Sequence, residues 1–125
     1  MNLASVLLLI CWLAAGCASY ETHAARRTAG LREMYPPGTS RQEVQRKWKP
    51  VEPDFSAARP GQGWRAYPND FIARKLAGVE VRTGKRVALV ERYWGPDGFV
   101  SLCWCWYFYD STERVIDVEW QYKSD

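Results

Sequence analysis

The alternation of apolar and polar residues is clearest in the last quarter of the chain. An apolar, aromatic run over 99–109 is followed by a short polar break and then by a second run over 115–122. Two such runs predict a β-hairpin. The apolar residues of the second run are Ile116, Val118, Trp120 and Tyr122. We expect these side chains to be buried and the intervening Asp117, Glu119 and Gln121 to face solvent.

Burial also predicts the register of this hairpin. A three-residue loop over 111–113 pairs Trp106 with Val118, whereas a two-residue loop places Trp106 beside Asp117. Because a slip of one residue turns every side chain to the opposite face, burial favours the three-residue loop. Glu113 must then adopt a left-handed conformation at a cost of roughly 1 kcal/mol. Several buried aromatic side chains, worth about 2 kcal/mol each, outweigh that cost.

Two helices are predicted before the hairpin. Ser40 and Glu43 have the spacing of a capping box, and Pro50 ends the first helix. Asn69 is placed to cap the second helix, and Gly84 to end it. The apolar stripes are Val44 and Trp48 on the first helix and Ile72, Leu76, Val79 and Thr83 on the second. The first helix therefore lies on a surface and buries one narrow face.

The segment 87–94 is predicted to be the first strand, with either Val87, Leu89 and Tyr93 or Ala88, Val90 and Trp94 facing the core. The Pro- and Gly-rich segment 51–70 is predicted to be an ordered surface loop pinned by Phe55, Trp64 and Tyr67. The predicted fold class is α+β, with two helices packed on a three-stranded antiparallel meander.

The N-terminus predicts export and lipidation. No charged residue precedes Glu21, and the apolar run 3–15 is shorter than the ~20 residues of a membrane span but suits a signal peptide. Its end, Ala15-Gly16-Cys17, resembles a bacterial lipobox. We therefore expect a lipoprotein signal peptide over 1–16, an acylated Cys17 on a tether over 17–35, and one domain over 36–125. The alternatives are an ordinary secretory peptide cut after Ala15 or Ala18, or an uncleaved anchor.

A family resemblance follows from the first helix. The residues Gly38-Thr39-Ser40-Arg41-Gln42-Glu43-Val44 and Trp48-Lys49-Pro50 resemble the G-x-[ST]-x-x-x-V…L-G-x-P signature of small outer-membrane lipoproteins of the BamE (SmpA/OmlA) type. The resemblance implies two helices on a three-stranded sheet, similar to a module of β-lactamase inhibitor protein. It also implies attachment to the outer membrane, on the periplasmic face, and a role in envelope assembly. Ala18 after the acylated cysteine is consistent with that location.

Composition narrows the chemistry. With 17 Lys and Arg against 14 Asp and Glu, the charge is too balanced for a nucleic-acid-binding surface. His23 is the only histidine, which excludes a His-based triad and a multi-His metal site. Cys103 and Cys105 point to the same face of one strand, with Cα atoms roughly 6.6–6.8 Å apart. They are interpreted as structural thiols, a strained disulfide or weak candidates for a soft-metal pair. No catalytic set and no cofactor are predicted.

The surplus of aromatic residues suggests a binding surface. The candidate residues are Trp94, Tyr107 and Tyr109 on the sheet and Trp64 and Tyr67 in the loop. Equally, the loop 51–70 folding over this face would make it a second small core. The predicted function is a non-catalytic lipoprotein, attached to the membrane through Cys17, that binds an envelope protein. The alternatives are a peptidoglycan- or carbohydrate-binding lipoprotein, and a thiol or soft-metal protein using Cys103 and Cys105.

Overall fold

A computed structural model describes residues 2–97 and 100–122, including their side chains except those of residues 7–20, 96, 97 and 100–102. Its elements in chain order are helix α1 (Leu3–Met34), helix α2 (Arg41–Trp48), strand β1 (Phe55–Ala58), 3-10 helix η1 (Trp64–Ala66), helix α3 (Asp70–Thr83), and strands β2 (Leu89–Asp97), β3 (Val100–Tyr109) and β4 (Val115–Tyr122). The strands form one antiparallel sheet in the order β1-β2-β3-β4.

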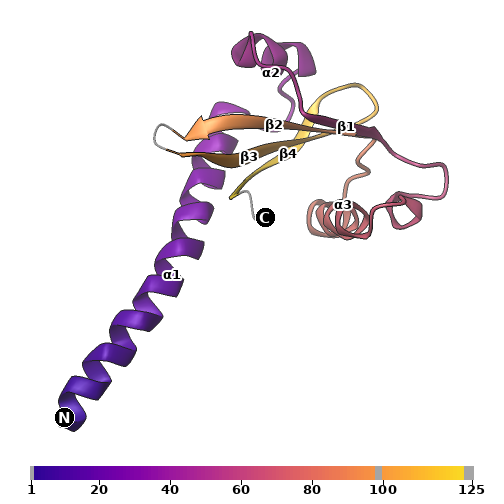
Figure 1. Ribbon diagram of the computed structural model, residues 1–125. Coiled ribbons are helices and arrows are strands. Elements are labelled where there is room, and N and C mark those ends of the chain that lie inside the picture. The colour runs from indigo at the N-terminus through magenta and orange to yellow at the C-terminus, as the bar shows by residue number, and fades with distance from the viewer. Residues whose placement is uncertain (1, 98–99, 123–125) are drawn as a thin grey trace.

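The α+β class is confirmed, but the sheet has four strands and its helices cover both faces. The end of α1 and the whole of α2 lie on one face, and α3 with η1 lies on the other (Figure 1). Each face therefore has its own apolar core. We call them the α2-side core, which includes Val44, Tyr93 and Tyr107, and the α3-side core, which includes Leu76 and Trp106.

The predicted boundaries of α2 and α3 are confirmed. The Ser40 side chain accepts a hydrogen bond from the Glu43 N–H at 3.2 Å, and Asn69 Oδ1 accepts one from the Ile72 N–H at 3.1 Å. Gly84 ends α3 with a φ of 67°, in the left-handed region. Each helix therefore begins and ends where its capping residues predict.

Strand β1 lies inside the segment predicted to be a loop. It has only four residues, with the sequence Phe-Ser-Ala-Ala, and pairs with β2 from Phe55↔Arg92 to Ala58↔Leu89. Prolines stand at positions 53 and 60 on either side of it. Such a short run with small residues has too little alternation to be distinguished from a loop, so the fourth strand could not be predicted by periodicity.

The hairpin loop is as predicted, but the register beyond it is not. Glu113 adopts a φ of 60°, and Tyr109 pairs with Val115. The register then shifts, so that Tyr107 pairs with Val118 and Trp106 with Glu119. The side chains of Val118 and Trp120 consequently join the α2-side core, and only Ile116 joins the α3-side core. The prediction assumed one dry face, whereas both faces of this sheet are buried and burial alone does not fix the register.

Both alternatives for the first strand are partly right for the same reason. Leu89 and Tyr93 belong to the α2-side core, while Val87 and Val90 belong to the α3-side core. Phe99, which was assigned to the hairpin, lies outside the described residues.

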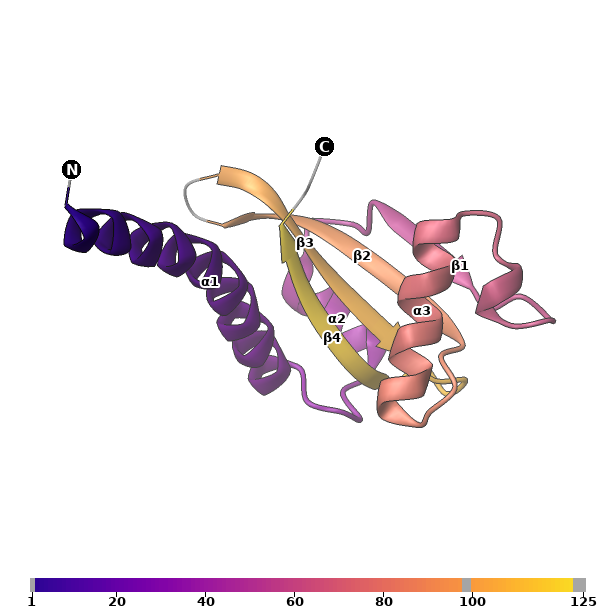
Figure 2. The ribbon, with the colours of Figure 1, turned by 90° about the horizontal axis from the view of Figure 1, so that it is seen from below.

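The predicted tether over 17–35 is instead part of a helix. α1 continues to Met34 and packs beside β4, as Figure 2 shows from below. Ala24, Leu31 and Tyr35 contribute to the α2-side core. The folded body therefore begins near Ala24 and not at residue 36, because the end of α1 carries apolar side chains that only the sheet can bury.

Candidate functional site

Three of the five predicted surface aromatics are buried. Tyr107 and Tyr109 have exposed fractions of 0% and are covered by α1 and α2, not by the 51–70 segment. Trp64 is 1% exposed on the opposite face, where its indole N–H donates to the Val87 carbonyl at 2.8 Å. These three residues were wrongly assigned to an interaction surface, because α1 and α2 cover Tyr107 and Tyr109, and Trp64 is itself part of the α3-side core.

The other two aromatics reach the surface. Trp94 on β2 is 45% exposed. Tyr67 is half-buried and contacts Phe55 and Trp64, with ring centroids 6.5 and 5.8 Å away. Trp94 and Tyr67 do not form a continuous platform with the buried tyrosines, so the predicted aromatic surface is not assembled.

The cysteines are placed as follows. Cys103 and Cys105 are buried in the α2-side core, no disulfide joins them, and the Cys103 thiol donates to the Gly95 carbonyl at 3.0 Å. Among the described residues, no group of three or more His, Cys, Asp or Glu side chains could hold a metal ion. Cys17 falls within α1, but its side chain lies outside the described part.

A search of the described residues finds no helix with both the length and the apolar character needed to cross a membrane.

A pocket of about 730 Å³ opens between α2 and β1. Its lining residues are Arg41, Gln45, Lys49, Pro50, Val51, Glu52, Pro53, Ser56, Glu91 and Tyr93. Prolines and Val51 supply apolar walls, whereas α2 supplies polar side chains. We call this the α2–β1 pocket.

An ion pair lines the α2–β1 pocket. Glu91 is only 2% exposed, and both of its carboxylate oxygens accept from Arg41, at 2.9 and 3.0 Å. Arg41 also donates to Glu113 at 2.8 Å, which ties α2 to the hairpin loop. A buried carboxylate is tolerated when a two-point guanidinium contact neutralises it.

Two buried hydroxyls lie on the same face of the sheet. Tyr93 Oη and Tyr109 Oη have no hydrogen-bond partner among the described residues. Burial, followed by the nearby Glu91 carboxylate, raises the pKa of Tyr93 to about 12 and also raises that of Tyr109. Both hydroxyls therefore stay protonated at neutral pH, and Tyr93, which lines the pocket, retains unused hydrogen-bonding capacity.

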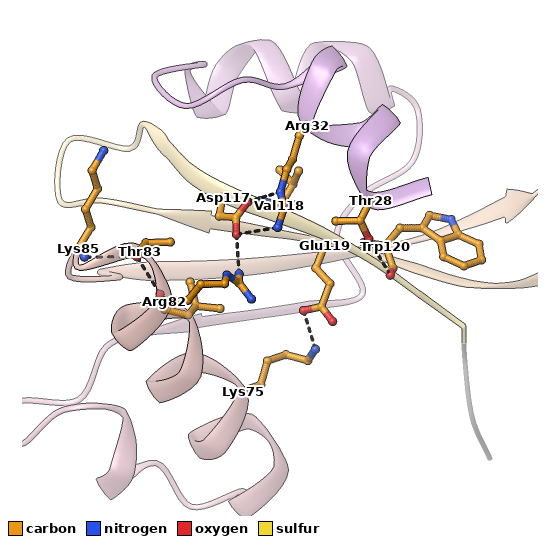
Figure 3. A network of polar contacts seen from close by, with 11 residues as sticks. Thr28, Arg32, Lys75, Arg82, Thr83, Lys85, Asp117, Val118, Glu119 and Trp120 are labelled. Carbon is orange, nitrogen blue, oxygen red and sulfur yellow. Dashed lines mark hydrogen bonds and ion pairs between the residues drawn. The ribbon is translucent and has the colours of Figure 1, made fainter. Parts of the chain in front are cut away.

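The edge of the sheet at β4 is covered by α1 (Figure 3). The Thr28 hydroxyl accepts from the Trp120 N–H at 3.1 Å and donates to the Trp120 carbonyl at 3.3 Å. Next to it, Asp117 accepts from the Val118 N–H at 2.8 Å. Asp117 also pairs with Arg32 of α1 at 2.9 Å and with Arg82 of α3. Side chains thus occupy edge groups that would otherwise attract another strand.

The edge at β1 is different. The Arg59 N–H donates to the Ala88 carbonyl, which continues the ladder past Ala58↔Leu89. Alternation along an antiparallel pair then turns the N–H and C=O groups of Ser56 and Ala58 away from β2. Within the described residues, no strand pairs with this outer edge, and Ser56 also lines the α2–β1 pocket.

Sequence reasoning missed this site. Only Val44 and Trp48 were predicted to be buried on the first helix, and neither Arg41 nor Glu91 received a role of its own. The available signal was Glu91 itself. It lies in the mostly apolar run Val87–Tyr93, where the other charged residue is Arg92. A charge in a strand whose neighbours are buried on both faces requires a partner.

Comparisons with known protein families, with curated proteins and with solved structures gave no match to this chain.

Proposed function

We propose that this chain is a lipid-anchored, non-catalytic protein-interaction module of the bacterial envelope, held at the periplasmic face of the outer membrane. The observation that carries the proposal is the apolar run 3–15 ending in Ala15-Gly16-Cys17. Acylation of Cys17 would supply two chains or more, and two chains make a stable anchor where one is marginal.

The path of α1 supports this arrangement. The helix is continuous from Leu3 to Met34, and its last turns pack on the sheet from Ala24 onward. Ala24 is seven positions after Cys17, which in a helix corresponds to about 10 Å. An acylated Cys17 would therefore hold the folded body close to the bilayer surface.

We further propose that the fold is a BamE-like module. Gly38 of the signature has a φ of 95°, and its N–H donates to the Val115 carbonyl at 2.8 Å. The signature thus joins the start of α2 to the final hairpin, and the strands β2-β3-β4 form a meander. β1 and the position of α3 on the opposite face are additions to the expected layout. Because a fold does not determine a function, the envelope-assembly role rests on the anchor and the partner.

The anchor is tested by the intact mass of the full chain expressed in a bacterium and extracted from its envelope. We expect a mature chain that begins at an acylated Cys17, and an unlipidated product for Cys17→Ser. An unlipidated chain of natural sequence would contradict the anchor.

The interaction is tested by photo-crosslinking in the same cells. A crosslinking residue at Ser56, Glu52 or Trp94 is expected to capture one envelope protein reproducibly, and the same residue at Arg74 on α3 serves to compare surfaces. Absence of any specific adduct from all four positions would contradict the interaction module.

The two alternatives receive little support from the described side chains. A sugar-binding platform needs exposed rings, but Tyr107, Tyr109 and Trp64 are buried. A thiol site needs access, and both Cys103 and Cys105 are buried in the α2-side core.

A further inference from the structure

The sheet has two unlike edges, and the edge at β1 adjoins the α2–β1 pocket. At β4, Thr28 and Asp117 occupy the outward N–H groups of Trp120 and Val118. At β1, the outward groups of Ser56 and Ala58 have no strand beside them among the described residues. The asymmetry makes β1 the edge at which another strand can add.

Ser56 connects this edge to the α2–β1 pocket. It pairs with Glu91, so its side chain lies on the α2 side of the sheet, and it lines the pocket. The residue of an added strand that lies opposite Ser56 would point to the same side. The small Ser56 side chain leaves that residue room to enter the pocket.

The charges of the pocket indicate what such a residue would be. Arg41 and Lys49 are balanced by Glu52 and Glu91, so the lining carries no net charge. Pro50, Val51 and Pro53 provide apolar walls. An uncharged side chain is buried there without leaving a charge unpaired, whereas a charged one would disturb the Arg41–Glu91 pair.

We propose that β1 is a strand-addition site for an extended segment of another protein, with the uncharged side chain opposite Ser56 held in the α2–β1 pocket. This site specifies how the interaction module proposed above would bind its partner. The inference therefore rests on that module, but not on the lipid anchor.

The proposal is tested with a displayed library of random twelve-residue peptides. Peptides that bind the full chain in detergent are selected from this library. The decisive variant is Ser56→Pro, which removes an outward N–H and leaves the hydrogen bonds to β2 in place. Its matched control is Ser56→Thr, which keeps the N–H. Circular dichroism and thermal unfolding check that both variants are folded.

We expect peptides that bind the natural chain and Ser56→Thr alike, with Ser56→Pro weakening their binding about tenfold or more. Peptide binding should slow amide exchange at Ser56 and Ala58, and the selected sequences should be enriched in uncharged residues at one position. Equal binding to Ser56→Pro, charged residues at that position, or no enriched peptide would each overturn the proposal.

Two further outcomes separate this inference from the module itself. Sedimentation that shows a dimer lost in Ser56→Pro would assign β1 to a second copy of this chain and overturn the commitment to another protein. Crosslinking to an envelope protein from Arg74 or Trp94 but not from Ser56 or Glu52 would keep the module and reject β1 as its site.

Discussion

At the scale of single residues, the carboxylate of Glu91 shows how strongly the fold depends on one partner. Glu91 is buried beneath α2, and Arg41 supplies both of its hydrogen bonds from a side chain. The pair crosses from α2 to β2, so it also fixes the position of the helix over the sheet. Removing one member leaves a buried charge, whereas removing both leaves an apolar contact.

Arg41→Met is expected to lower the free energy of unfolding by about 3 kcal/mol, because Glu91 then stays buried without a counter-charge. Urea unfolding followed by tryptophan fluorescence measures this loss. The double variant Arg41→Met/Glu91→Met should recover most of it. A single variant as stable as the natural chain would show that water or another cation reaches Glu91.

Asp117 makes stability depend on pH. Burial alone would raise its pKa, but hydrogen bonds from Arg32, from the Val118 N–H and from Arg82 outweigh burial and keep the pKa below its usual range. A carboxyl with a lowered folded-state pKa stabilises the fold above its unfolded value, about 3.9, and this stabilisation is lost as the pH falls through the folded-state pKa. The free energy of unfolding, measured between pH 7 and pH 2.5, should therefore fall less steeply in Asp117→Asn. An unchanged slope would mean that other carboxyls carry the dependence.

At the scale of elements, local signals were sufficient for α2 and α3 and insufficient elsewhere. Capping residues such as Ser40 and Asn69 act within one turn, so the sequence alone locates these ends. β1 is a strand because its backbone pairs with that of β2. The end of α1 is held in place by its contacts with β4. Those contacts join residues that are far apart in sequence, as in the hydrogen bond between Thr28 and Trp120. The periodicity of apolar residues does not predict such contacts.

Gly78→Ala is expected to stabilise the protein. Gly78 lies in the interior of α3, and a Cβ there would have no heavy atom within 4 Å. Alanine should therefore raise the free energy of unfolding by roughly 0.5–1 kcal/mol, because glycine is the poorer helix former. Gly84→Ala is the matched control and should destabilise by about 1 kcal/mol, since its φ of 67° is left-handed. Thermal unfolding of both variants gives the comparison, and a destabilised Gly78→Ala would contradict it.

At the scale of the whole molecule, the number of aromatic residues is explained by a sheet that is buried on both faces. The chain has seven Trp and seven Tyr, and five of these lie fully buried on β2, β3 and η1: Trp64, Tyr93, Trp106, Tyr107 and Tyr109. The sequence predicted a surplus of aromatic residues available for binding. It did so because the layout expected from the sequence did not have helices on both faces of the sheet. The candidate site was hidden for a related reason, since Arg41 and Glu91 are 50 residues apart.

The two-sided core also predicts where the folded body begins. A chain starting at residue 24 keeps Leu31 and Tyr35, whereas one starting at residue 36 loses both from the α2-side core. The shorter chain should be less stable by roughly 4 kcal/mol, at about 2 kcal/mol for each buried side chain. Urea unfolding of the two truncated chains measures the difference. Equal stabilities would restore the boundary at residue 36.

The unlike edges of the sheet set a limit on assembly. With the β4 edge occupied by Thr28 and Asp117, the described part of each molecule has one valence for edge-to-edge pairing, at β1. A monovalent unit can form a pair but cannot propagate, because the pair presents only its two occupied edges. In a crowded compartment, α1 would thus act as a chain terminator that prevents the sheet from seeding a fibril.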